Sequence, residues 1–193
     1  MTAWTGSPHS SRTATPARRT LEKVLSVLIF ALVLWQLYQS SKVGVTPRGT
    51  PAREALQHMH ISVGVTLLAL VMVRLWLWGV LPRPPRPARV PMTADALARH
   101  CNLAFYLTVL VQGVTGPMFA WSEAHSVTWF GLITLPKLVP TSYRIQVTLG
   151  YLHSAVGMWI MLLVAFSLLV SIWQAVRYRA PPWRMLPGFD WGR

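Results

Sequence analysis

Charged residues are scarce in this sequence, acidic residues are scarcer still, and there is a single cysteine. Charged side chains occupy 12% of the 193 positions and hydrophobic ones 53%, a balance too apolar for an ordinary soluble domain. The length is that of one domain. The lone thiol, Cys101, excludes an intrachain disulfide and any metal site built from several cysteines. These scarcities point to a membrane protein.

Four long apolar stretches follow one another along the chain, at residues 24–38, 55–80, 103–121 and 147–175. Each approaches the roughly 20 residues that a membrane-spanning helix needs. The sequence has no repeated alternation of polar and apolar residues of the kind that a membrane β-barrel requires. The sequence therefore predicts an all-α bundle of four transmembrane helices over residues 21–178. A flexible basic tail at 1–20 and an interfacial tail at 179–193 are expected to flank it.

The distribution of Lys and Arg gives the expected orientation. With the amino terminus in the cytoplasm, the inner segments carry twelve of these residues and the two outer connections carry five. This bias is typical of the positive-inside rule and places both termini in the cytoplasm. The net charge of +13 is then explained by topology and by anionic lipid head groups, so no nucleic-acid partner is expected.

The connections between the helices differ in composition. The first outer connection, 39–54, contains two glycines and two prolines and turns the chain back. The inner connection, 81–92, contains five prolines, which favour extended backbone. The second outer connection, 122–146, includes the apolar segment WFGLITLP, which we expect to form a short interfacial helix.

A histidine followed four residues later by a glycine occurs twice, as HISVG at 60–64 and HSAVG at 153–157. Both histidines lie in the opening turns of helices that run in the same direction, so His60 and His153 are expected at similar depth. Because positions i and i+4 share a helix face, Gly64 and Gly157 lie one turn below them. An ionisable side chain inside a span is expected to face the bundle interior and to have a partner.

Two interpretations of this repeat are open at the level of the residues. Two imidazoles at one depth can hold a haem iron from both faces, with the glycines making room for the macrocycle. Alternatively, the glycines allow close helix packing and each histidine bonds to a neighbouring carbonyl group.

Several arginines lie near these helices. Arg53 and Arg144, with Tyr143 or Lys137, are candidates to neutralise haem propionates, although a surface arginine is often only solvated. Arg74, near the inner end of the second helix, either extends to the lipid head groups or has a specific anionic partner.

In order and spacing, these features resemble the bacterial cytochrome b561 family, including its superoxide oxidase-like branch. The resemblance rests on His60, Gly64 and Arg74 in the second helix, the proline-rich inner connection, FGLITLP, the histidine early in the fourth helix, and RMLP at 184–187. It covers residues 21–187. It implies a multi-pass protein of the bacterial inner membrane that carries two haems and exchanges electrons with a quinone, ubiquinone in the branch that oxidises superoxide.

The departures from the family change what the resemblance implies. The family holds an inner haem between a histidine on the first helix and one on the fourth. Here the first helix has no histidine, the matching position in the fourth is Ser167, and a family histidine near the start of the third is Asn102. The resemblance therefore implies one haem b, with His60 and His153 as its metal ligands.

Two functions remain open at this stage. One is electron transfer between a quinone and a periplasmic donor or superoxide, as an oxidoreductase or as a simple carrier. The other is an accessory subunit of a larger respiratory or photosynthetic membrane complex, in which the fold has lost much of its redox role.

Overall fold

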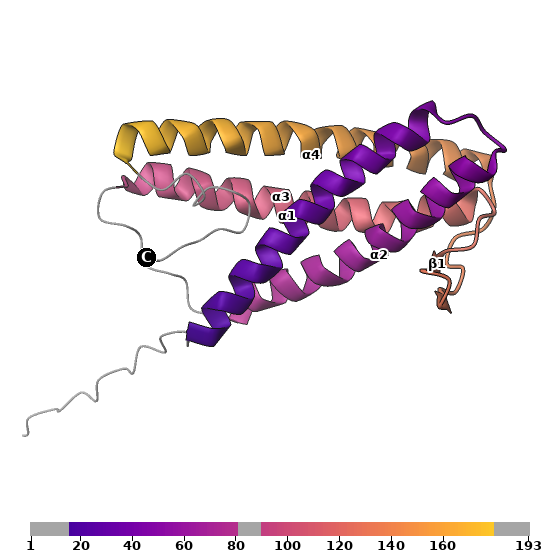
Figure 1. Cartoon of the computed structure of the whole chain (residues 1–193), viewed down its shortest axis with the longest axis horizontal. Helices are drawn as coiled ribbons and strands as arrows, with labels where there is room; N and C mark the ends of the chain where they lie inside the picture. The colour runs from indigo at the N-terminus through magenta and orange to yellow at the C-terminus, as the bar shows by residue number, and fades with distance from the viewer. Residues whose placement is uncertain (1–15, 81–89, 180–193) are drawn as a thin grey trace, which may run out of the picture.

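Four long helices dominate the structure (Figure 1). The computed structural model describes residues 16–80 and 90–179. The helices are α1 (Pro16–Val45), α2 (Pro51–Val80), α3 (Met92–Ser122) and α4 (Tyr143–Tyr178). Each is long and apolar enough to cross a membrane. The predicted all-α bundle of four transmembrane helices is confirmed.

The helices extend beyond the apolar stretches that predicted them. The first connection, expected over 39–54, is reduced to residues 46–50, because α1 continues to Val45. At the other end, α1 begins at Pro16, inside the segment predicted as a tail. Similarly, α3 begins at Met92, well before the apolar stretch that starts at residue 103. In its first two turns Arg99 pairs with Asp95, one turn earlier on the same helix. Helix ends of this kind are stabilised by polar contacts, which a search for apolar runs does not detect.

Some predicted segments lie outside the described residues. They are the first fifteen residues of the amino-terminal tail, most of the proline-rich connection (81–89), and the carboxyl-terminal tail from residue 180.

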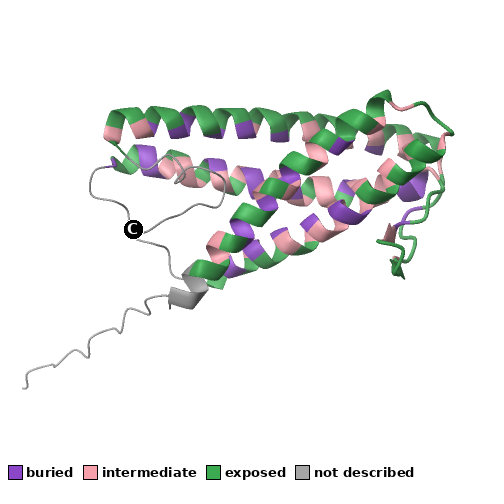
Figure 2. Cartoon of the chain, viewed as in Figure 1, coloured by how far each residue is buried: buried purple, intermediate pink, exposed green. Residues whose placement is uncertain are grey.

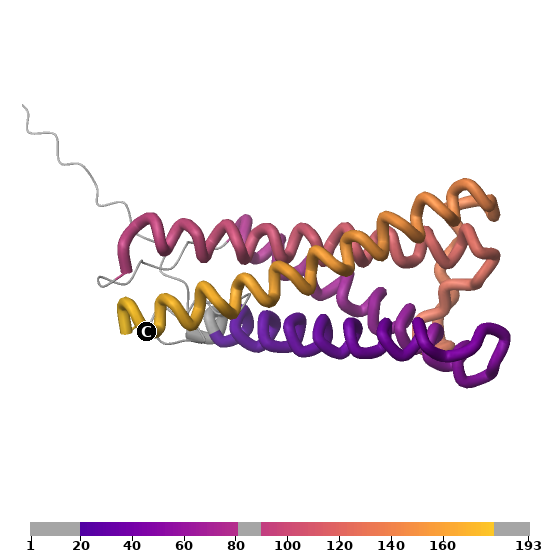
Figure 3. Tube along the Cα trace, turned by 90° about the horizontal axis from the view of Figure 1, so that it is seen from above, coloured from indigo at the N-terminus to yellow at the C-terminus, as the bar shows by residue number. Residues whose placement is uncertain are grey.

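Consecutive helices pack against one another, α1 with α2, α2 with α3, and α3 with α4. In the view from above, α4 lies beside α3 at the end that carries the 123–142 connection (Figure 3). From there it runs obliquely to α3 toward the other end of the bundle. The outward faces are largely exposed (Figure 2) and include Trp76, Trp159, Leu169 and Val176. So much apolar surface would be unfavourable in water, and it is the surface that lipid covers in a multi-pass membrane protein.

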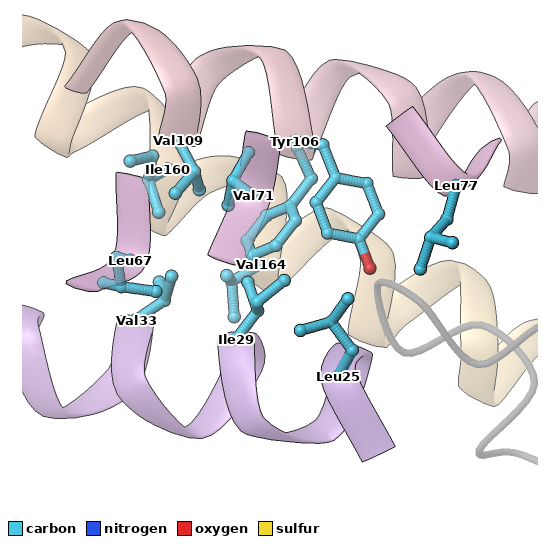
Figure 4. Close-up of a cluster of buried hydrophobic side chains, with 11 residues drawn as sticks. Leu25, Ile29, Val33, Leu67, Val71, Leu77, Tyr106, Val109, Ile160 and Val164 are labelled. Atoms are coloured by element: carbon cyan, nitrogen blue, oxygen red, sulfur yellow. The ribbon is translucent and has the colours of Figure 1, made fainter. Parts of the chain in front are cut away.

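The interior contains two apolar clusters. The larger one fills the middle of the bundle and the end opposite the 123–142 connection, with residues from all four helices, among them Ile29, Val71, Phe105 and Val164 (Figure 4). The smaller one lies under the 123–142 connection and includes Trp121, Val127 and Leu149.

The segment WFGLITLP is not a helix, so the expectation of a short interfacial helix is wrong. Strands β1 (Thr128–Trp129) and β2 (Ile133–Thr134) pair in antiparallel register instead. Phe130 and Gly131 between them have φ angles of 46° and 72°. Two consecutive positive φ angles are those of a type I′ turn, which the glycine makes easy to adopt.

The hairpin is attached to α2 at Ser62 and Thr66, two and six residues beyond His60. The backbone N–H of Phe130 donates to Ser62 Oγ at 3.0 Å, and the indole N–H of Trp129 donates to Thr66 Oγ1 at 3.0 Å. Ser62 is almost completely buried. These bonds between distant parts of the chain explain why a hairpin forms where composition alone suggested an amphipathic helix.

Candidate cofactor site

The two histidines of the repeated motif face each other inside the bundle. His60 lies nine residues into α2 and His153 ten residues into α4, so their depths match. Their ring centroids are 6.3 Å apart, with the ring planes at 80°. Both side chains are half-buried. The structure therefore brings together two residues that lie 93 positions apart in the sequence.

The ring of His153 is held by two side chains of α3. Its Nδ1 lies 3.2 Å from Thr115 Oγ1, and its Nε2 lies 3.1 Å from Gln112 Nε2. Phe119, also on α3, stacks against the ring with centroids 6.4 Å apart. Thr115 is buried, and Gln112 and Phe119 are half-buried.

The surroundings of His60 are less complete. Gln36 of α1 donates from Nε2 to the backbone oxygen of His60 at 2.8 Å, and does not bond to the ring. The Nδ1 atom of His60 is buried and finds no hydrogen-bond partner in residues 16–80 and 90–179. Since an unsatisfied buried polar atom is unfavourable, this ring has room for a hydrogen-bond or metal partner that residues 16–80 and 90–179 do not supply.

The two glutamines occupy equivalent places. In each helical hairpin, α1–α2 and α3–α4, the first helix supplies a glutamine and the second supplies the histidine and the glycine. The Oε1 atoms of Gln36 and Gln112 are also buried, without a partner in the described part of the chain. The histidines and glutamines thus form a polar layer between the two apolar clusters, with three polar atoms left unsatisfied.

The glycines of the motif are not positions of close helix contact. A Cβ atom added to Gly64 would meet only Gln36 Nε2, at 3.2 Å, and one added to Gly157 only Gln112 Nε2, at 3.4 Å. Gly113 differs, because its Cβ would lie 3.0 Å from Leu68 Cβ and 3.4 Å from Leu68 Cα. Helix packing thus accounts for Gly113. Gly64 leaves room for the amide of Gln36, and Gly157 has only an ordinary contact with the amide of Gln112.

No known protein-family model matches this sequence. Membership of the cytochrome b561 family therefore stays a prediction that rests on the residues quoted above.

A metal held by side chains alone would need more ligands than this site offers. Among the described residues, no group of three or more His, Cys, Asp or Glu side chains is arranged to hold a metal ion. The pair of His60 and His153 supplies two ligands. A metal bound between them would take its other ligands from another group, as a porphyrin provides them for iron.

The sequence interpretation missed several residues of this site. Gln112, Thr115 and Gly116 belong to the segment QGVTGP, in which polar and small residues interrupt the apolar run of α3. Gly116 makes room for the histidine, since a Cβ there would lie 3.1 Å from His153 Cε1. The available signal was an amide inside a membrane span, which needs a partner as much as a histidine does.

The residues named as candidate propionate partners lie in different environments. Arg53 is half-buried and donates from its Nη1 atom to the carbonyl oxygens of Val43 and Thr46, at 2.6 and 2.7 Å, so it closes the α1–α2 turn. Arg144 is exposed on the first turn of α4, next to the exposed Tyr143. Lys137 is exposed and donates to Thr141.

Arg74 has a specific anionic partner and does not extend to the surface. It is buried at the end of the bundle opposite the histidines. Its Nε donates to Ser26 Oγ at 3.1 Å, and its guanidinium lies 3.9 Å from the carboxylate of Glu22. Tyr106 also donates to Ser26, at 3.2 Å, and its ring faces the arginine. Of the two interpretations left open for Arg74, the ion pair is the correct one.

Ser167, the position that the resemblance matches to the family's inner histidine on the fourth helix, is buried in α4. The Oγ atom of Ser167 has no hydrogen-bond partner among the described residues. Val164, three residues earlier on α4, belongs to the larger apolar cluster (Figure 4). Asn102 is half-buried on α3, three residues before Phe105, which is the first α3 residue of the larger apolar cluster.

Proposed function

We propose that this protein is a membrane cytochrome b with a single haem b held by His60 and His153. In this proposal it exchanges electrons with a quinone, ubiquinone by the family resemblance, and with a second partner at the end of the bundle that carries the 123–142 connection. The observation that supports the proposal most strongly is the pair of histidine rings that face each other in a polar layer between two apolar clusters.

The spacing of the rings fits a metal bound between them. An imidazole nitrogen lies about 2 Å from the metal that it binds, so two rings on opposite sides of one metal have centroids roughly 6 Å apart. The observed centroid separation is 6.3 Å. A metal between the rings would account for this separation without a hydrogen bond from one ring to the other.

The unsatisfied atoms and the glycines point the same way. Nδ1 of His60 is buried without a partner in the described residues, and Gly64 and Gly157 face only the tips of amide side chains. Because glutamine side chains can turn to another rotamer, they can vacate the space beside the glycines when a flat group binds. The donor set also fits, since imidazole is a usual axial ligand of haem iron.

When bound, haem b supplies one-electron chemistry. The residues of this chain determine what that chemistry can do. His60 and His153 would both hold the iron, which would leave no place on it for oxygen or other small ligands. The apolar clusters on both sides of the layer keep water away, which influences the redox potential.

The charges at this end suit an anionic reactant. Lys42, Arg48, Lys137 and Arg144 are exposed near it, and a cationic surface attracts an anion such as superoxide. An oxidoreductase would show quinone reduction by superoxide with the isolated protein. Co-purification with other membrane subunits, without that activity, would favour the accessory-subunit function.

Haem content per polypeptide tests the proposal directly. We expect one low-spin b-type haem in the purified protein, lost in His60→Ala and in His153→Ala. The matched controls are His58→Ala and His100→Ala, because both side chains are exposed and should leave haem content unchanged. Retention of haem in either ligand variant, or two haems in the wild type, would contradict the proposal.

A further inference from the structure

The hydrogen bonds around His153 determine which of its ring nitrogens carries the proton. Thr115 Oγ1 lies 2.9 Å from the carbonyl oxygen of Val111, one turn earlier, and 3.2 Å from His153 Nδ1. A threonine inside a helix commonly donates its one hydroxyl proton to the carbonyl at i−4. The hydroxyl oxygen is then free to accept a proton from Nδ1.

The second ring nitrogen supports the same assignment. Gln112 places an amide nitrogen, which can only donate, 3.1 Å from His153 Nε2. With the proton on Nδ1, three hydrogen bonds form together: Thr115 to Val111, the ring to Thr115, and Gln112 to the ring. With the proton on Nε2, Gln112 would have to reverse its amide and Thr115 would have to release Val111, which leaves two. The Nδ1–H tautomer is therefore favoured.

We propose that Thr115 is a positioning residue that fixes His153 as the Nδ1–H tautomer with its Nε2 lone pair available for iron, and that Gln112 occupies this lone pair until the cofactor binds. The inference rests on the proposed function for the identity of the cofactor. A ligand histidine whose other ring N–H has an acceptor is held in orientation and becomes a better ligand. Thr115 supplies that acceptor, although neither the motif nor the family resemblance singles it out.

The proposal gives Gln112 and Gln36 different effects. Gln112 competes with the metal for Nε2, whereas Gln36 bonds to the backbone oxygen of His60 and leaves that ring free. Gln112→Met, which keeps the shape and removes the donor, should bind haem about five-fold more tightly, the equivalent of one ordinary hydrogen bond. Gln36→Met removes no donor from a ring nitrogen and should give no such gain. The control expected to keep the wild-type affinity is Gln174→Met, because the amide of Gln174 donates to the carbonyl oxygen of Ala94 at the start of α3, away from the histidines.

The decisive experiment compares Thr115→Val with Thr108→Val. Thr108 lies two turns earlier on α3 and also donates to the carbonyl at i−4, Ala104, but it does not touch the histidine. Haem affinity should fall about ten- to a hundred-fold in Thr115→Val. It should recover in Thr115→Ser and remain at the wild-type level in Thr108→Val. The midpoint potential should rise in Thr115→Val, because the axial imidazole donates less electron density.

A second measurement does not depend on haem. Nitrogen-15 NMR of histidine-labelled, haem-free protein in lipid nanodiscs reports the tautomer of His153, with its signals assigned by their loss in His153→Ala. We expect the Nδ1–H form in the wild type and in Thr108→Val, and a mixture in Thr115→Val. An Nε2–H form in the wild type, or equal haem affinity and potential in the two threonine variants, would overturn the inference. A chain that has the Nδ1–H form but binds no haem would refute the proposed function and still support the role of Thr115 in orienting the ring.

Discussion

Alanine substitution of the glycines separates the two explanations of the repeated motif. If Gly157 exists to let helices approach, a methyl group there should destabilise the protein even without cofactor. If it exists to leave room for a cofactor, the methyl group should be tolerated by the haem-free protein and should impair haem binding. Gly113, which does lie at a close helix contact, is the internal control.

The geometry gives the size of each effect. In a helix, Gly→Ala adds about 0.5–1 kcal/mol of stability by reducing backbone freedom. At Gly157 the new Cβ would lie 3.4 Å from a flexible amide nitrogen, an ordinary contact, so this gain should be kept. At Gly113 the Cβ would lie 3.0 Å from Leu68 Cβ, and overpacking of this kind costs about 1–3 kcal/mol. The haem-free Gly157→Ala variant should therefore be at least as stable as the wild type, and Gly113→Ala less stable.

Haem binding should respond in a different order. A methyl group in a space that a flat ring must occupy costs about 1–3 kcal/mol, which corresponds to roughly five- to 150-fold weaker binding. We expect this loss in Gly157→Ala and, with a slightly closer contact at 3.2 Å, in Gly64→Ala.

Two assays on each variant give the answer. Thermal unfolding in detergent measures the stability of the haem-free protein, and a spectrophotometric titration measures haem affinity. The reasoning is refuted if Gly157→Ala destabilises the haem-free protein as much as Gly113→Ala does, since the glycine would then serve helix packing. Unchanged haem affinity in both Gly64→Ala and Gly157→Ala would refute it as well.

Two other perturbations test the contacts around the bundle. Arg74→Met removes the partner of Glu22 and the donor to Ser26 inside the bundle, and should cost about 2–4 kcal/mol in unfolding free energy, whereas Arg144→Met at the exposed start of α4 should cost almost nothing. Equal thermal stability of the two variants would contradict the buried ion pair. Ser62→Ala leaves the N–H of Phe130 without its acceptor and should speed hydrogen exchange across residues 123–142, because the hairpin loses its attachment to α2. An exchange rate equal to that of the wild type would show that the remaining contacts suffice.

The fold was predictable because long apolar runs carry a strong signal. The positions of the four spans and the matched depth of His60 and His153 follow from residue order and helix geometry alone. The helix ends were not predictable in the same way, since pairs such as Asp95 with Arg99 extend a helix without adding apolar residues.

The rest of the site depends on how the helices face one another. That Gln112 and Thr115 meet His153 follows from the packing of α3 on α4, which sequence periodicity does not determine. The hairpin could not be predicted from local sequence either, because Ser62, which stabilises it, lies 66 positions before Thr128 in the chain. Arg74 could be recognised as a residue that needs a partner, but its burial and the choice of Glu22 required the structure.

The location of the polar layer restricts the route that electrons can take under the proposed function. Arg74 lies 14 residues beyond His60 on α2, about 21 Å along the helix axis. At that level the interior is occupied by Tyr106 with its hydroxyl bonded to Ser26, and by the ion pair with Glu22. A hydrocarbon core about 30 Å thick cannot be crossed from a single cofactor near one end without a second one to receive the electron. Donor and acceptor must therefore both reach the end that carries the histidines, unless a second protein brings another cofactor to the opposite end. A purified chain that reduces quinone in detergent, but moves no electrons across the membrane of a sealed vesicle, is the behaviour that this arrangement implies.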